Sequence, residues 1–156
     1  MGRQRHNVEI PEEGLAFGDF EIIAPVERLG GAKQYAVVVG RHVPSGTKCA
    51  IKVQTMSGKD DGMCVEEELY RAAEKFKPAY VPKVLGAGVL PTVDLRVLAL
   101  QLLGPSVQDV LDDVVGRPFS PPSATYLAIL MLRAIRQVHK SGFGTSRATT
   151  RVSPHN

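Results

Sequence analysis

The stretch QYAVVVGRHVPSGTKCAIKVQ, Gln34–Gln54, contains two runs of strand-like composition separated by residues typical of a turn. We predict an antiparallel hairpin with strands at Gln34–Val43 and Lys48–Gln54 and a turn at Pro44–Thr47. The preceding segment Phe20–Leu29 also mixes β-branched and polar residues, although a proline interrupts it. Together the three segments predict an antiparallel meander.

The second strand of this hairpin contains a lysine among small and apolar residues. Cys49, Ile51 and Val53 alternate with Ala50 and Lys52, which is the period of a strand buried on at least one face. A lysine there is costly unless its ammonium group finds a partner. Two interpretations remain open from the residues alone. The ammonium either reaches nucleotide phosphate and is held by a glutamate of the next helix, or it points to water from a sheet edge.

Further along the chain the apolar period changes to that of helices, then back to strands, and then to helices again. The segments concerned are the helices Gly62–Lys77, Gly104–Val115 and Phe119–Gly142 and the strands Val81–Leu90 and Leu95–Leu103. Ser106 with Asp109 fits a capping box, and Ser120 before Pro121 fits a helix start. Five strands and these helices predict an α+β fold with an antiparallel sheet.

Composition bounds the class of protein. The chain has 156 residues, of which 44% are hydrophobic and 22% charged, as in a soluble globular domain. The longest apolar run, Tyr126–Leu132, is too short to cross a bilayer, and the N-terminus lacks the apolar segment of a secretory signal. Cys49 and Cys64 have no zinc-like or redox spacing. We expect an intracellular protein (cytoplasm or nucleus) with free thiols, no metal site and no membrane partner.

The charge is unevenly distributed along the chain. The net charge is +3, and no acidic residue follows Asp113. A basic segment can bind nucleic acid. However, aromatic residues do not interleave with these cations, and no nucleic-acid motif is present. We expect a solvated basic face rather than a nucleic-acid partner.

Five segments in order resemble a eukaryotic protein kinase. CAIK (Cys49–Lys52) stands where these kinases have V-A-I-K. LRVLALQLLGPSVQDVL (95–111) is similar to the hinge of the casein kinase I group. ELYRAAEKF (68–76) and VPKVLGAGV (81–89) resemble the vaccinia-related branch. FSPPSATYLAILMLRAIRQVHKSGF (119–143) resembles the helix before the catalytic loop, also in the tau-tubulin kinase branch.

The resemblance implies a domain organisation. Residues 20–103 would form a kinase-like small lobe and hinge, with a five-stranded antiparallel sheet and one helix. Residues 1–19 would be a flexible lead-in, 104–143 the first two helices of a truncated large lobe, and 144–156 an irregular tail. ATP with Mg²⁺ would be the cofactor of the full-length family.

The resemblance also assigns site residues. Lys52 takes the place of the phosphate-contacting lysine, and Glu66 that of its ion-pair partner, because it precedes Tyr70 by four residues. Glu67 is the alternative partner. Leu100 falls at the gatekeeper position, Gln101 and Leu103 supply hinge backbone groups to adenine, and Ala50 and Val37 form the roof over its ring. The expected nucleotide-binding residues are therefore Gly30, Val37, Ala50, Lys52, Glu66, Leu100, Gln101 and Leu103.

The chain departs from the family in its Gly-rich loop. The positions of G-x-G-x-x-G-x-V fall on Gly30, Ala32, Tyr35 and Val37, so only the first glycine is kept. The glycines of this motif let the backbone approach phosphate closely. The bulky Tyr35 at a close-approach position therefore predicts weakened phosphate binding.

The second departure concerns catalysis. After Phe143 the family continues with H-R-D-x-K-P-x-N, whereas this chain reads GTSRATTRVSPHN and contains neither a catalytic aspartate nor a D-F-G segment. An alignment of RVSPHN with that loop would make Asn156 a metal-binding residue. We expect no catalytic residue here, and weak or absent binding of Mg·ATP.

Three functions remain possible from the sequence. The first is a truncated form of a casein kinase I-like Ser/Thr kinase, inactive as it stands. The second is a short pseudokinase that binds a protein partner through the exposed apolar faces of its helix at Ser120–Lys140. The third is an unstable polypeptide without function.

Overall fold

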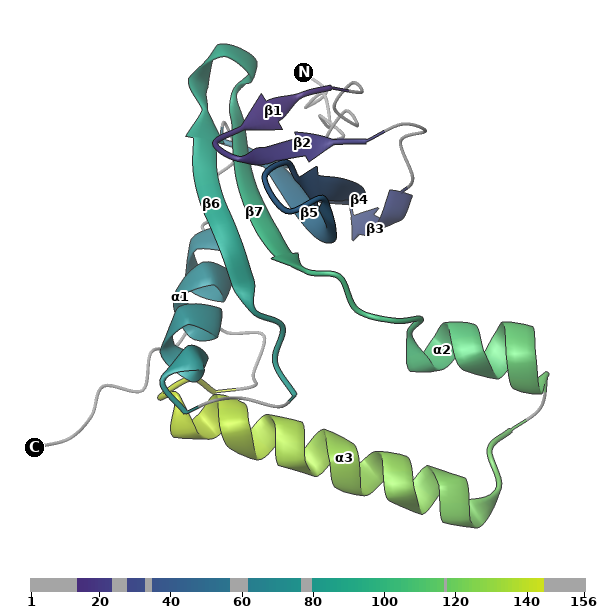
Figure 1. Ribbon diagram of the computed structural model, residues 1–156. Coiled ribbons are helices and arrows are strands. Elements are labelled where there is room, and N and C mark those ends of the chain that lie inside the picture. The colour runs from purple at the N-terminus through teal and green to yellow at the C-terminus, as the bar shows by residue number, and fades with distance from the viewer. Residues whose placement is uncertain are drawn as a thin grey trace, which may run out of the picture. The chain divides into compact units, whose positions relative to one another are not determined.

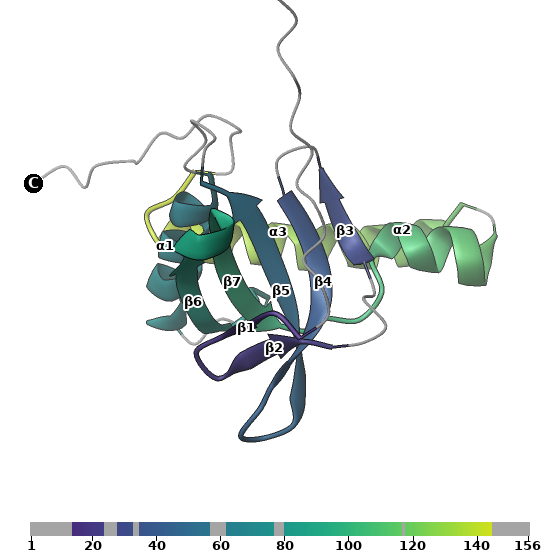
Figure 2. The same ribbon diagram turned by 90° about the horizontal axis from the view of Figure 1, so that it is seen from above.

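The predicted hairpin, with its turn at residues 43–46, lies at the centre of a curled antiparallel sheet in this computed structural model. The structure describes residues 14–23, 28–32, 35–56, 62–76, 80–116 and 118–144. Its strands are β1 Ala16–Phe17, β2 Phe20–Ile22, β3 Arg28–Ala32, β4 Tyr35–His42, β5 Thr47–Thr55, β6 Val84–Leu90 and β7 Leu95–Gln101. The pairing order is β1-β2-β4-β5-β7-β6, and β3 pairs with β4. Figure 2 shows β6, β7, β5, β4 and β3 side by side.

The α+β class and the antiparallel sheet are confirmed, but the expected count of five strands is wrong. The described residues form seven strands, because Phe20–Leu29 contributes two separate strands and β1 adds another. β2 and β3 lie along the same edge of β4, β2 opposite Gly40–His42 and β3 opposite Tyr35–Val38. An uninterrupted strand is disfavoured where a proline removes a backbone donor.

The short strand β1 forms a hairpin with β2. Phe17 pairs with Phe20 across Gly18 and Asp19, and Gly18 has a φ of 50°, which glycine adopts without strain. The rings of Phe17 and Phe20 stack with centroids 5.3 Å apart. This pair closes one end of the core, so β1 is stabilised by aromatic packing rather than by its length.

The core lies on one face of the sheet. Its buried residues are Phe17, Phe20, Ile22, Ala36, Val38, Cys49, Ile51, Val53, Val97 and Ala99. The sheet curls until β1, at one end of the strand order, meets β6 at the other (Figure 1). In β6, Gly86 lies against the Phe20 ring of β2, and Gly88 lies against the Phe17 ring of β1. On the opposite face Val39 and Leu98 are also buried, and they stand directly opposite Ala50 and Lys52 of β5.

The first helix begins at the predicted residue, Gly62, and the next two begin directly after the predicted caps Ser106 and Ser120 rather than at Gly104 and Phe119. They are α1 Gly62–Glu74, α2 Val107–Asp109 with its wider continuation η2 Val110–Val115, and α3 Pro121–Lys140, and a short helical turn η1 Pro91–Val93 joins β6 to β7. Ser106 and Asp109 form the expected capping box, and Ser120 caps α3. Among the described helices, none has the length and apolarity needed to cross a membrane.

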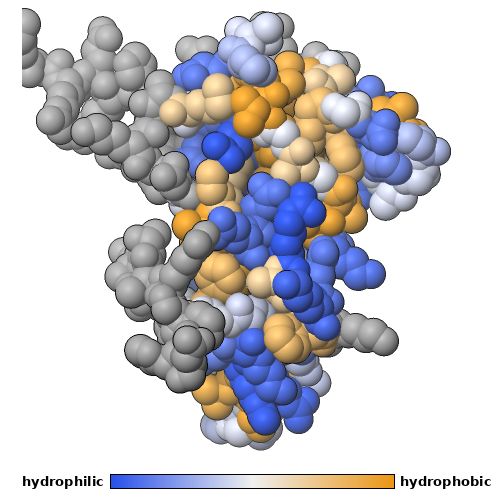
Figure 3. Space-filling view, turned by 90° about the vertical axis from the view of Figure 1, so that its left-hand side faces the viewer, coloured by the Kyte–Doolittle hydropathy of each residue, from blue (hydrophilic) through white to orange (hydrophobic). Residues whose placement is uncertain are grey.

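The chain divides into two compact units. The sheet unit comprises Met1–Glu68 with Pro82–Leu102, and the helical unit comprises Leu69–Val81 with Leu103–Asn156. In the helical unit, the backbone N–H of Tyr80 donates to Oε1 of Gln137 at 3.2 Å. Figure 3 shows one side of the molecule, where hydrophobic residues are interspersed with hydrophilic ones.

Candidate functional site

Lys52 lies on the face of β5 that turns away from the core. It stands directly opposite Val37 of β4 and Leu98 of β7, and Ala50 stands opposite Leu100. Directly opposed residues project from the same face of a sheet. Val37, Ala50 and Leu100 are each half-buried. The structure therefore brings these expected residues onto the face that holds Lys52.

The Lys52 ammonium group is paired with a carboxylate. Its Nζ donates to Oε2 of Glu66 in α1. The side chains of Lys52 and Glu66 are 15% and 25% exposed. Because β5 lies between β4 and β7 and the lysine is largely covered, the alternative of an edge lysine pointing to water is wrong.

A second neighbour covers the same ammonium group. The ring of Tyr35 lies with its centroid 4.1 Å from Lys52 Nζ, within the range of a cation–π interaction. Sequence reasoning treated Tyr35 only as a bulky residue in a degraded loop and missed this contact. The spacing in the sequence could have indicated this contact. Tyr35 precedes Val37 by two residues, so both side chains lie on the same face of β4, and Tyr35 is diagonally across from Lys52.

The expected Gly-rich segment forms the β3–β4 pair. Gly30 stands opposite Val37, Ala32 stands opposite Tyr35, and the register is irregular between Arg28 and Gly30. The backbone of β3 therefore runs beside the strand that presents Val37 and Tyr35.

The expected hinge residues follow β7. The backbone N–H of Gln101 donates to the carbonyl of Lys83 at 2.9 Å, which ties the end of β7 to the segment before β6. Leu103 belongs to the helical unit, and its side chain is 61% exposed. The structure thus gathers seven of the expected residues in the sheet unit (Gly30, Val37, Ala50, Lys52, Glu66, Leu100 and Gln101) but not Leu103.

Metal ligands do not cluster in the part of the chain that the structure describes. No group of three or more His, Cys, Asp or Glu side chains among these residues is placed to hold a metal ion. Asn156, considered above as a metal ligand, lies outside the described residues. The chemistry of the described site is therefore that of a paired ammonium group beside a half-exposed apolar surface.

No model of a known protein family matches this chain.

Proposed function

We propose that the sheet unit is a nucleotide-binding small lobe of the casein kinase I-like type, in a chain that is a truncated or partial Ser/Thr kinase. The observation that supports this most is the Lys52–Glu66 pair on the face of the sheet that turns away from Cys49, Ile51 and Val53. A lysine held by a carboxylate is positioned to receive phosphate oxygens, the use that kinases make of such a pair.

The apolar neighbours suit the rest of a nucleotide. Val37, Ala50 and Leu100 lie on the same face as Lys52 and are half-buried, so they offer an apolar surface to a purine ring. In this proposal the backbone of Gln101 lies at the adenine edge, and Gly30 lies beside the phosphates. Mg²⁺ would enter with ATP, bound mainly by the phosphates.

Phosphoryl transfer is not part of the proposal for this chain alone. The transfer needs an aspartate that accepts the proton of the substrate hydroxyl and a further carboxylate that binds metal. No acidic residue follows Asp113 in this sequence. We therefore propose nucleotide binding without transfer, and detectable transfer of the γ-phosphate by the purified chain would contradict it.

A titration with Mg·ATP tests the proposal. Isothermal calorimetry would compare the unchanged chain with Lys52→Met and with Lys48→Met, an exposed lysine of the same strand as the matched control. The Lys52 variant should bind at least about tenfold more weakly, since a charged hydrogen bond to phosphate is worth about 1.5–3 kcal/mol. Equal affinities in all three proteins, or no binding by the unchanged chain, would contradict it.

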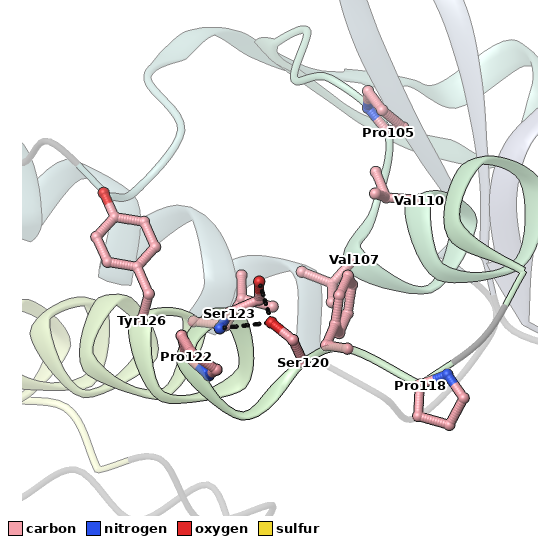
Figure 4. A pocket seen from close by; sticks show the side chains of 10 residues that line it. Pro105, Val107, Val110, Pro118, Ser120, Pro122, Ser123 and Tyr126 are labelled. Atoms are coloured by element: carbon pink, nitrogen blue, oxygen red, sulfur yellow. Dashed lines mark hydrogen bonds between the residues drawn. The ribbon is translucent and has the colours of Figure 1, made fainter.

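A second candidate function is protein binding by the helical unit. A groove of about 860 Å³ lies between α2 and the start of α3. Its lining includes Val107, Val110, Phe119, Tyr126 and Leu127 (Figure 4). Further along α3, Met131 and Leu132 are 62% and 64% exposed. Exposed apolar groups of this kind mark interaction surfaces in many proteins.

Point variants distinguish protein binding by the helical unit from nucleotide binding by the sheet unit. Proximity labelling in cells would compare the unchanged chain with Tyr126→Asp, Leu132→Asp and Lys52→Met. If the helical unit binds a protein, the first two variants lose labelled partners and the Lys52 variant keeps them. The same labelled proteins in all four samples would rule out this second function.

A further inference from the structure

We propose that Tyr35 closes the Lys52 site and that its ring must move before nucleotide phosphate can reach the ammonium group. This inference rests on the proposed function of the same face. It makes Tyr35 a residue that controls access to the site rather than one that binds the ligand.

The contacts of Lys52 support this. The ammonium group lies between the Glu66 carboxylate and the Tyr35 ring, whose centroid is 4.1 Å from Nζ. The lysine side chain is only 15% exposed. A phosphate oxygen must come to about 2.8 Å from Nζ to form a charged hydrogen bond. It therefore needs space that the ring or the carboxylate now occupies.

The ring is the weaker of the two neighbours. A carboxylate attracts an ammonium group by full charge, whereas a tyrosine face attracts it only through the ring quadrupole. An incoming phosphate that displaces Tyr35 keeps the Lys52–Glu66 pair, but one that displaces Glu66 loses it. Tyr35 is thus the group that yields.

The position of Tyr35 allows this movement. It is the first residue of β4, and its side chain is half-buried, whereas the core residue at this end of the strand is its neighbour Ala36, which is fully buried. Rotation of the Tyr35 ring away from Lys52 leaves Ala36 and the core packing in place. The closed arrangement lowers the apparent affinity by the fraction of time that the site is open.

The first test needs no nucleotide. An N-hydroxysulfosuccinimide ester of acetic acid is a negatively charged reagent that acylates lysine. Mass spectrometry would give the acylation rate of Lys52 relative to the exposed Lys48. In Tyr35→Ala this ratio should rise about three- to tenfold, which corresponds to the free energy of a partly covered cation–π contact. Tyr35→Phe keeps the ring, so its ratio should equal that of the unchanged chain.

A titration with Mg·ATP follows with the same variants. Tyr35→Ala should bind more tightly than the unchanged chain, and Tyr35→Phe should not differ from it. An unchanged Lys52 acylation ratio, or weaker ATP binding in Tyr35→Ala, would overturn the inference. If acylation rises but no variant binds ATP, the ring does cover Lys52 and it is the nucleotide proposal that fails.

A folding defect must not decide the result. Thermal unfolding of each variant comes first. If Tyr35→Ala does not fold, Tyr35→Leu replaces it, since leucine keeps much of the side-chain volume at this strand position but has no π face. Tyr35→Leu should show the same rise in the acylation ratio of Lys52 to Lys48. An unchanged ratio in this variant would overturn the inference.

Discussion

At the scale of single residues, Lys52 shows how a β-strand can hold an internal cation. The charge is tolerated because a carboxylate and an aromatic ring both lie on it. Without the carboxylate, a largely covered ammonium group would lack its main partner. Glu66 therefore supports the fold as well as the proposed site.

Replacing Glu66 tests this dual role. Glu66→Gln should lower the free energy of unfolding by about 1–2 kcal/mol, below the value for a fully buried pair because both side chains keep some exposure. Urea unfolding of a double-mutant cycle with Lys52→Met gives the coupling of the pair. A coupling indistinguishable from zero would contradict a stabilising pair.

Two glycines of β6 make a matched pair for packing. A Cβ at Gly86 would overlap the Phe20 ring, whereas a Cβ at Gly88 would lie 3.6 Å from Cγ2 of Val97, an ordinary contact. Gly86→Ala should cost about 1–3 kcal/mol of stability through overpacking. Gly88→Ala should be nearly neutral in the same urea titration. Equal urea midpoints for the two variants would show that the Phe20 ring of β2 does not lie close to β6.

At the scale of elements, the helix starts could be predicted because their causes are local. Ser106 and Asp109 bond each other's backbone N–H groups at 3.1 and 2.7 Å, as the capping-box pattern predicts. The strand count could not be predicted. β1 contains two residues and depends on Phe17 stacking on Phe20, a contact that local periodicity does not reveal.

The capping box of α2 should respond to acid. The hydrogen bonds from Ser106 lower the pKa of the Asp109 carboxyl group. Because the folded-state pKa is lowered, the stabilisation is complete above the ordinary aspartate pKa of about 4 and is lost as pH falls through the lowered value. An NMR titration of the Asp109 carboxyl carbon measures this. In Ser106→Ala its pKa should move up toward the ordinary value, and an unchanged pKa would contradict the assignment.

The candidate site was predictable only in part. The Lys52 strand and a glutamate-bearing helix were visible in the residues, but the choice of Glu66 depended on the kinase resemblance. Tyr35 was missed because a cation–π contact depends on register across two strands, and the register emerges only when the hairpin is built.

At the scale of the whole molecule, thiol reactivity reports on folding. Cys49 is fully buried in the core of the sheet unit, and this burial raises the pKa of its thiol, whereas Cys64 in α1 is half-buried. The thiolate is the reactive form, so Cys49 should resist alkylation in the folded protein. Iodoacetamide labelling followed by mass spectrometry should show Cys64 modified first and Cys49 only as urea unfolds the sheet.

The same experiment addresses the third possibility, an unstable polypeptide. A stable sheet unit predicts a sharp rise of Cys49 labelling over a narrow range of urea concentration. Rapid labelling of Cys49 without urea would show that the chain does not hold its core.

The most direct test of the central claim is a two-dimensional NMR titration of the ¹⁵N-labelled chain with Mg·ATP. The account predicts chemical-shift changes at the backbone amides of Val37, Ala50, Lys52 and Leu100, with Leu132 of α3 unaffected, and the loss of these changes in Lys52→Met. Changes confined to the groove between α2 and α3, or no changes at all, would contradict a nucleotide site on the Lys52 face.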